Sequence, residues 1–235
     1  MTTRRSPVAL TSTHQDLVAA GAVMGKIGGW LVPLRLADHG DEIEAVRERV
    51  GVVEQSHLSK LRLHGTDSPA VLGRLGTYPP VGRASKAAIA TPGGDVEVEV
   101  AHLADGEAWV TAPAGCRDDL RQTVEALAQD AAVFDVTSSF ASFRLVGPLA
   151  GHVISSLADL DIRPSALPDG ACAQTMLAEV YALIVRSDLG ALPSYRLFFG
   201  REYGLYMWES VAEAGRGRGM AIVGTEALAA LEECR

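Results

Sequence analysis

The stretch PGGDVEVEV, residues 92–100, is a turn followed by a strict alternation of acidic and apolar residues. Successive side chains of a β-strand point to opposite faces, so the three valines share one face and the three acidic residues share the other. The acidic residues are Asp95, Glu97 and Glu99. The alternation predicts a strand over residues 95–101 with one apolar face and one acidic face.

The segments on either side predict a mixture of hairpins and helices. EAWVTA follows a turn at residues 104–106 and completes a hairpin with the acidic strand. LSKLRLHG, residues 58–65, predicts a strand that leads directly into a helix with Asp67 or Ser68 as its N-cap. Further helices are expected over residues 14–25, 38–50, 115–130, 149–160, 203–213 and from 225 onward. Further strands are expected over residues 132–136, 142–146, 178–186 and 195–199, and an exposed loop is expected over residues 164–171. This order indicates an α+β fold with mixed or antiparallel sheets and packed helices, rather than a doubly wound parallel sheet.

The composition is that of a globular chain with a real core. Of its 235 residues, 48% are hydrophobic and 21% are charged, and no Gly/Ser linker divides them. We therefore expect a single unit built from two closely packed lobes, residues 45–135 and residues 1–44 together with 136–235.

Charge and cysteine usage narrow the possible partners and the compartment. The formal net charge of −8 argues against nucleic acid, because such binders carry basic patches. Three separated cysteines suggest neither a disulfide framework nor a structural zinc site. No signal peptide or membrane span is apparent, so we expect a cytoplasmic protein that does not contact membranes.

Familiar catalytic motifs are missing from the sequence. It contains no nucleophile elbow, P-loop or dinucleotide fingerprint, and the spacing of its histidines does not require a metal. Cys172 falls in a predicted loop without a neighbouring histidine or lysine, so we interpret it as an inert thiol.

Several segments, in order, carry a family resemblance. GGW at residues 28–30 with Pro33 is similar to a G-W-x-x-P motif, and EAVRERVGVVEQSHLS, residues 44–59, is similar to an R…GlfD-SHm segment. LRLHGTDSPAVLGRL, FDVTSSFASFRLVGPLAGHVISSL and GMAIVGTEALAALEECR continue the series. Together they resemble the folate-binding aminomethyltransferase superfamily, which includes the glycine cleavage T-protein and the gamma subunit of heterotetrameric sarcosine oxidase. The resemblance implies that fold without its C-terminal barrel, since the sequence ends at Arg235.

The resemblance gives the acidic strand a possible role. In the family a Gly-Gly hairpin leads to a carboxylate that contacts folate, four positions after the second glycine. Counted from Gly94, that position is Val98, so a one-residue shift is needed before Glu97 or Glu99 can face a reacting amine or iminium. The alternative is that the acidic row is simply the solvated side of a half-exposed strand.

A second family motif, R-T-G-Y-T-G-E-x-G-Y/F-E, corresponds to residues 186–196. Arg186 and Tyr195 match it, whereas Leu189 replaces the tyrosine and Leu192 replaces the glutamate that binds the pterin ring. The resemblance implies tetrahydrofolate as cofactor, with Arg186 anchoring a carboxylate. We predict Glu97 and Glu99 as catalytic residues, no metal ligands, and a binding site formed by Trp30, Lys86, Asp95, Arg186 and Tyr195.

Three functions follow as expectations. The first is a tetrahydrofolate-dependent one-carbon transferase, of aminomethyl or methylene type, that holds folate or a small amine in a central cleft. The second is a non-catalytic subunit that docks to a larger oxidase or carrier subunit. The third is that the fold serves a different reaction and has lost folate binding.

Overall fold

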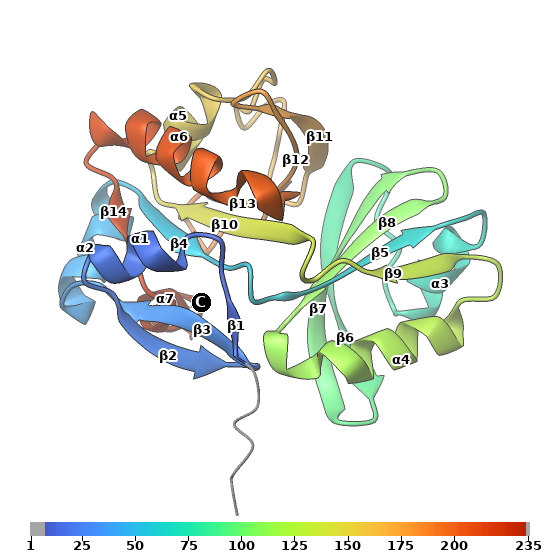
Figure 1. Cartoon of the computed structure of the whole chain (residues 1–235). Coiled ribbons are helices and arrows are strands. Elements are labelled where there is room, and N and C mark those ends of the chain that lie inside the picture. Colours follow the sequence, from blue (N-terminus) through green and yellow to red (C-terminus); the bar gives the residue numbers. More distant parts are fainter. Residues whose placement is uncertain (1–7, 234–235) are drawn as a thin grey trace, which may run out of the picture.

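The computed structural model describes residues 8–233, whose strands form three sheets (Figure 1). Near the N-terminus is a three-stranded sheet in the order β1-β3-β2, accompanied by three helices. These elements are β1 (Ala9–Leu10), α1 (His14–Ala19), β2 (Val23–Ile27), β3 (Trp30–Arg35), α2 (His39–Glu48) and the C-terminal α7 (Thr225–Glu233). Helix α7 packs against α2 and β3, so the two ends of the described chain lie in the same part of the molecule.

A five-stranded antiparallel sheet contains the acidic strand. Its order is β6-β7-β8-β5-β9, and its strands are β5 (Ser59–His64), β6 (Arg83–Thr91), β7 (Gly94–Ala104), β8 (Glu107–Ala112) and β9 (Ala132–Asp135). Two helices, α3 (Ser68–Arg74) and α4 (Arg117–Leu127), cover one face, and a short 3-10 helix, Ala114–Cys116, precedes α4. The valines of the acidic strand pack on this face, because Val98 and Val100 belong to one core cluster with Leu120 and Val124 of α4.

A six-stranded mixed sheet makes up most of the remainder, in the order β11-β12-β13-β10-β4-β14. Its strands are β4 (Gly51–Glu54), β10 (Phe140–Val146), β11 (Cys172–Leu177), β12 (Val180–Arg186), β13 (Ser194–Gly200) and β14 (Ala221–Ile222). One face packs against α5 (Ala150–Ser155) and α6 (Gly204–Arg216), the latter preceded by the 3-10 turn Arg201–Tyr203. Phe143 lies at the centre of this contact, with ring centroids 5.0 Å from Phe199 and 5.4 Å from Trp208.

The other face of the six-stranded sheet meets the uncovered face of the five-stranded sheet. Ala101 and Trp109 from one sheet form a buried cluster with Leu183, Val185 and Phe198 from the other. Strand β10 is therefore buried on both faces, which explains its nearly continuous apolar sequence. This contact between the sheets positions the candidate site.

The predicted mixed fold is confirmed, and its departures from expectation are local. The helix expected over residues 14–25 ends at Ala19, because Gly21 adopts φ +88° and the chain turns into β2. The helix expected over residues 149–160 ends at Ser155. Strands β1, β2, β3, β4, β6, β11 and β14 were not predicted. The alanine-rich β6 carries little propensity of its own and is held by pairing with β7. The two-lobe division stays a prediction.

Asp67 occupies the N-cap position of α3 without capping it. Its Oδ2 accepts hydrogen bonds from Arg74 Nη1 at 3.3 Å and from the Gln129 backbone N at 3.1 Å.

In the described part of the chain, no helix is long and apolar enough to span a bilayer.

Candidate functional site

The acidic row on β7 is divided between solvent and interior. Asp95 and Glu97 are exposed, whereas Glu99 is only 7% exposed. The three side chains share one face, but β7 runs from an exposed hairpin tip into the contact between the two sheets. The interpretation as a solvated face therefore holds for Asp95 and Glu97 and not for Glu99, whose catalytic role stays a prediction.

Glu99 forms a buried ion pair with Arg196 of β13. Arg196 Nη1 donates to Glu99 Oε2, and Arg196 Nε donates to Gln55 Oε1 at 3.2 Å. Burial alone would raise the pKa of Glu99, but Arg196 and the more distant Arg144 hold that pKa below its ordinary value. Glu99 is therefore an ionised carboxylate at neutral pH.

Arg144 and Arg196 lie directly opposite each other in the β10–β13 ladder. Like charges in this position repel, and burial together with Arg196 lowers the pKa of Arg144 to about 10. Carboxylates offset the repulsion, because Arg144 Nη1 donates to Glu232 Oε1 at 2.6 Å while Arg196 pairs with Glu99. The site therefore holds two neighbouring cations, each paired with its own carboxylate.

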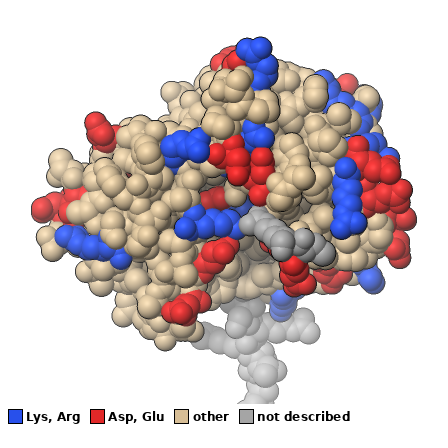
Figure 2. Space-filling view, turned by 180° about the vertical axis from the view of Figure 1, so that it is seen from behind, with Lys and Arg blue, Asp and Glu red and all other residues tan. Residues whose placement is uncertain are grey.

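A cavity of about 150 Å³ opens beside this charged group. We call it the Glu99 pocket; its polar lining consists of Gln55, Lys86, Glu97, Glu99, Thr111, Arg196 and Glu232. A neighbouring cavity of about 210 Å³ shares Lys86 and Glu99 and adds Arg186 and Asp188. On the face of the molecule seen in Figure 2, acidic and basic side chains are likewise interspersed. Such a lining suits a ligand that carries both an amine and a carboxylate.

Of the predicted site residues, Lys86 and Glu97 join Glu99 in this pocket. Lys86 is the cross-strand partner of Glu99 in the ladder, and its Nζ donates to Glu97 Oε1 at 2.9 Å. Asp95 pairs with Ala90 near the exposed hairpin tip and is not part of the pocket lining.

Arg186 and Tyr195 lie next to each other, with the Arg186 guanidinium 5.4 Å from the Tyr195 ring centroid. Arg186 donates to both carboxylate oxygens of Asp188, at 3.0 and 2.8 Å, and to the Leu167 carbonyl at 2.8 Å. These contacts occupy its guanidinium within the protein. Its role as an anchor for a ligand carboxylate stays a prediction.

Trp30 lies away from the Glu99 pocket. It is 5% exposed, has the Arg201 guanidinium 5.7 Å from its ring centroid, and lines a separate cavity with Gly28, Ala114 and residues of the α4 N-terminus. The structure thus brings Glu97, Glu99 and Lys86 together and leaves Trp30 and Asp95 apart from them. The ligand roles assigned to all these residues stay predictions.

Leu189 and Leu192, the two departures from the pterin motif, bridge each other in the turn between β12 and β13. Leu189 is 4% exposed, and both leucines pack with Val223 and Leu228 in the core cluster beside α7. An apolar contact therefore occupies the position where the family motif has its carboxylate.

Cys172 is the first residue of β11, so its predicted loop position is wrong. Its thiol is buried and donates to the His102 carbonyl, with an Sγ–O distance of 3.7 Å. Burial raises the pKa of this thiol to about 12, which keeps it protonated and supports its interpretation as inert.

A second buried polar group lies where the chain passes from β4 to β5. Lys60 is fully buried, and its Nζ donates to the carbonyls of Ser56 at 2.8 Å and Leu58 at 2.7 Å. Burial raises the pKa of the neighbouring Glu54 to about 7 and lowers that of Lys60 to about 7. Sequence reasoning assigned no role to either residue, because β5 alternates like a strand with one solvated face.

Sequence reasoning did not single out Arg144, and Arg196 entered it only as the last residue of the motif segment 186–196. Each is the single charged residue of an apolar strand, FASFRLV and SYRLFFG. A lone arginine in such a strand indicates a buried, paired charge, and that signal was available.

Comparison with known proteins assigns the chain to one family. Residues 13–233 match the family model described as the GCVT N-terminal domain. The chain belongs to this family, which confirms the resemblance inferred from its sequence motifs.

Two relatives illustrate the match. The aminomethyltransferase of Streptomyces coelicolor is 30% identical over 224 residues, covering 90% of this chain and 58% of that protein. The mitochondrial dimethylglycine dehydrogenase of mouse is 27% identical over 210 residues, covering 86% of this chain and 24% of that protein. The chain thus spans less than two thirds of the length of these relatives.

Solved structures share the fold at low sequence identity. The glycine cleavage system aminomethyltransferase T of Bartonella henselae superimposes with a TM-score of 0.82 at 18% identity, over 96% of this chain and 62% of that one. A chain of the heterotetrameric sarcosine oxidase of Corynebacterium sp. U-96 gives 0.61 at 19% identity, over 79% of this chain and 94% of that one. Within residues 8–233, the three sheets form no closed barrel.

Proposed function

We propose that this protein is a one-carbon transferase of the aminomethyl or methylene type that binds a small amine or tetrahydrofolate in the Glu99 pocket. The observation that carries the proposal is the buried carboxylate of Glu99, which lines the pocket and is held ionised by Arg196. Family membership and the aminomethyltransferase names of several relatives support the reaction class.

An ionised carboxylate in a buried pocket attracts positive charge. Glu99 would orient the ammonium group of a ligand and would stabilise the positive charge of a methylene-iminium ligand. Because its pKa is lowered, Glu99 would not act as a proton donor at neutral pH. Lys86 and Arg196 would attract a carboxylate of the same ligand.

Tetrahydrofolate fits this lining less well than a small amine does. The amino edge of a pterin needs a carboxylate or amide partner, and leaving a buried group unpaired costs about 1–3 kcal/mol. Leu192 supplies no such partner, and Gln55 Oε1 and one of the two carboxylate oxygens of Glu99 already accept from Arg196. Glu97 is the accessible alternative, because its exposed pair with Lys86 is worth only about 0–1 kcal/mol.

Calorimetric titration tests the proposal with four ligands: tetrahydrofolate, 5,10-methylenetetrahydrofolate, sarcosine and dimethylglycine. We expect millimolar or tighter binding of at least one of them by the wild-type protein, and binding weakened at least about tenfold in Glu99→Gln. Glu125→Gln, on the exposed face of α4, is the matched control. Absence of heat with all four ligands at millimolar concentration would contradict the proposal. Binding of the amines without either folate would support recruitment of the fold to a different reaction.

A second candidate function is that of a non-catalytic subunit, as in the sarcosine oxidase gamma chain. The sarcosine oxidase chain that matches is covered over 94% of its length, so a fold of this extent occurs inside a larger oxidase. Exposed aromatic and aliphatic side chains at the start of α6 would suit docking: Tyr203, Leu205 and Tyr206.

Co-purification with the products of neighbouring genes, followed by mass determination of the complex, distinguishes these functions. A stable complex with an oxidase or carrier subunit, without turnover by the isolated chain, supports the function as a non-catalytic subunit. Turnover by an isolated monomer contradicts it.

We place both functions in the cytoplasm, a proposal supported by the unpaired thiols of Cys116 and Cys172.

A further inference from the structure

A cavity of about 250 Å³ lies on the face of the six-stranded sheet that packs against α5. We call it the Tyr195 pocket. Tyr195 and Arg196 are consecutive residues of β13, so their side chains point to opposite faces of the sheet. The Tyr195 pocket therefore lies on the other side of this sheet from the Glu99 pocket, and the two share no lining residue.

Three prolines give the Tyr195 pocket an apolar wall that a ligand can reach. Pro148 and Pro164 are exposed, and Pro193 is half-buried. Proline has no backbone N–H, so this wall presents ring carbons without a competing donor. A cavity of about 150 Å³ holds one benzene ring, so the Tyr195 pocket has room for one ring with small substituents.

The hydroxyl of Tyr195 is the buried polar group of this pocket. Tyr195 is 2% exposed, and that small exposed part includes the hydroxyl oxygen, which has no hydrogen-bond partner within residues 8–233. Gly151 of α5 leaves the hydroxyl open to the pocket, because a Cβ added at Gly151 would lie 3.3 Å from it. Burial raises the pKa of the hydroxyl, so the group stays protonated at neutral pH. A ligand oxygen in the pocket would supply the missing acceptor.

The rim of the pocket favours an anion. Among the described residues, the ionisable side chains that line it are all basic: His152, Arg163 and Arg186. Arg186 is already paired with Asp188. Arg163 is 79% exposed, and its pair with Asp161 is solvated, so Arg163 can exchange that partner for a ligand carboxylate at little cost. We therefore expect an anionic group at the rim and a neutral oxygen inside.

We propose that the Tyr195 pocket binds a single-ring carboxylate. The ring packs against the three prolines, the carboxylate meets Arg163 at the rim, and a neutral oxygen on the ring pairs with the Tyr195 hydroxyl. Because the pocket lies on the other face of the sheet from the Glu99 pocket, binding here does not depend on the proposed one-carbon chemistry.

Three compounds test the proposal by NMR titration of the full chain. 4-Hydroxybenzoate carries all three groups, benzoate lacks the hydroxyl, and 4-hydroxybenzamide lacks the negative charge. We expect 4-hydroxybenzoate to bind with a dissociation constant of millimolar order or tighter, and each of the other two at least about fivefold more weakly. Absence of saturable binding of 4-hydroxybenzoate, or equal affinities for the three compounds, would overturn the proposal.

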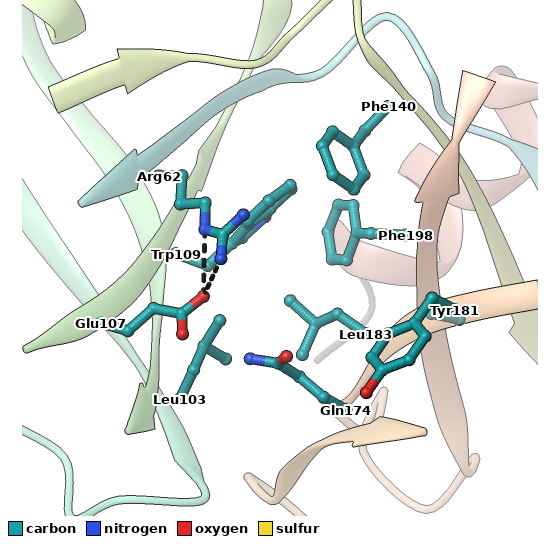
Figure 3. A pocket seen from close by; sticks show the side chains of 10 residues that line it. Arg62, Leu103, Glu107, Trp109, Phe140, Gln174, Tyr181, Leu183 and Phe198 are labelled. Atoms are coloured by element: carbon teal, nitrogen blue, oxygen red, sulfur yellow. Dashed lines mark hydrogen bonds and ion pairs between the residues drawn. The ribbon is translucent and has the colours of Figure 1, made fainter. Parts of the chain in front are cut away.

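Tyr195→Phe tests the hydrogen bond itself. The variant loses only a hydroxyl that has no partner within the protein, so its fold should be unchanged, and it should no longer prefer 4-hydroxybenzoate over benzoate. The matched control is Tyr181→Phe, which removes a 73% exposed hydroxyl-bearing side chain's oxygen from the separate cavity beside Arg62 and Glu107 (Figure 3). This control should keep the wild-type preference. The same preference in Tyr195→Phe would contradict the proposed contact.

Two further variants test access and charge. Gly151→Ala suits a helix and places a methyl group against the Tyr195 hydroxyl, so it should weaken 4-hydroxybenzoate binding at least about fivefold. Arg163→Met should remove most of the preference for 4-hydroxybenzoate over its amide. Wild-type behaviour of both variants would show that the ligand binds elsewhere, and this outcome is readable even if Tyr195→Phe does not fold.

Discussion

The guanidinium of Arg196 on β13 donates a hydrogen bond to the carboxylate of Glu99 on β7, and this ion pair joins the two main sheets. Both side chains are nearly buried, at 10% and 7% exposure. The carboxylate proposed to bind a ligand is therefore also part of the contact that holds the sheets together, so binding and stability are coupled at Glu99.

The first prediction concerns the stability of this pair. Glu99→Leu or Arg196→Met leaves one buried charge without its partner and should each lower the free energy of unfolding by about 3–5 kcal/mol. The double variant removes both charges and should cost clearly less than the sum of the single changes. Urea unfolding of the four proteins measures this coupling, and strictly additive effects would show that the two residues do not depend on each other.

The second prediction concerns Lys86. Its pair with Glu97 is largely exposed, so Lys86→Met should change the free energy of unfolding by less than about 1 kcal/mol. Because Lys86 lines the Glu99 pocket, the same change should weaken binding of ligands that carry a carboxylate. Arg121→Met, which breaks an exposed pair on α4, is the control. Equal ligand affinity in both variants would exclude Lys86 from the binding site.

The third prediction is a pH dependence due to Glu54. Burial raises its pKa from 4.5 to about 7, so between these values the folded chain holds a proton that the unfolded chain has lost. Stability therefore falls as pH rises through this window, by at most about 1.4 kcal/mol per pH unit. Glu54→Gln should remove this decline.

Urea unfolding of wild type and Glu54→Gln at pH 5 and pH 7 measures the difference. The wild type should lose stability relative to the variant as the pH rises, and the exposed Glu97→Gln should follow the wild type. The lowered pKa of Lys60 acts in the opposite direction above neutrality. Between its folded value of about 7 and its ordinary value of 10.5, the unfolded chain holds a proton that the folded chain has lost, so stability rises with pH. Parallel pH profiles of wild type and Glu54→Gln would contradict this role of Glu54.

The fourth prediction compares two glycines with positive φ. At Gly147, φ is +126° and an added Cβ would lie 2.5 Å from the Val46 carbonyl oxygen and 2.6 Å from that of Arg49. At Gly190, φ is +60° and no heavy atom lies within 4 Å of the same position. Gly190→Ala should cost about 1–2 kcal/mol, and Gly147→Ala should cost clearly more because backbone atoms must move. Thermal unfolding of the two variants compares their losses of stability. Equal losses would show that the backbone at the end of β10 shifts enough to accommodate the added methyl group.

The local patterns of the sequence predicted many of the regular elements. The alternation in residues 92–100 predicted β7 and placed its valines on one face, where Val98 and Val100 pack beneath α4. The hairpin to β8 and the helices α2, α4, α6 and α7 followed from turn residues and apolar periodicity. Strand β6 escaped prediction because its small residues carry a weak pattern and its pairing partner decides its conformation.

The candidate site was predictable only in part. Glu97 and Glu99 were both identified, but their positions in the row do not distinguish them, since the two side chains point to the same face of one strand. Arg144 and Glu232 lie 88 positions apart in sequence and meet only in the folded chain. No local pattern specifies such a pair.

The sequence by itself determined that β7 has an apolar face and an acidic face, because a period of two is a property of the extended chain. Only the tertiary structure decided which acid is buried. The six-stranded sheet packs over the end of β7 and not over its beginning, so Glu99 loses water and gains Arg196 while Asp95 and Glu97 stay in solvent. Residues 92–100 cannot encode that difference, because it is set by strands β10 and β13, which are distant in sequence.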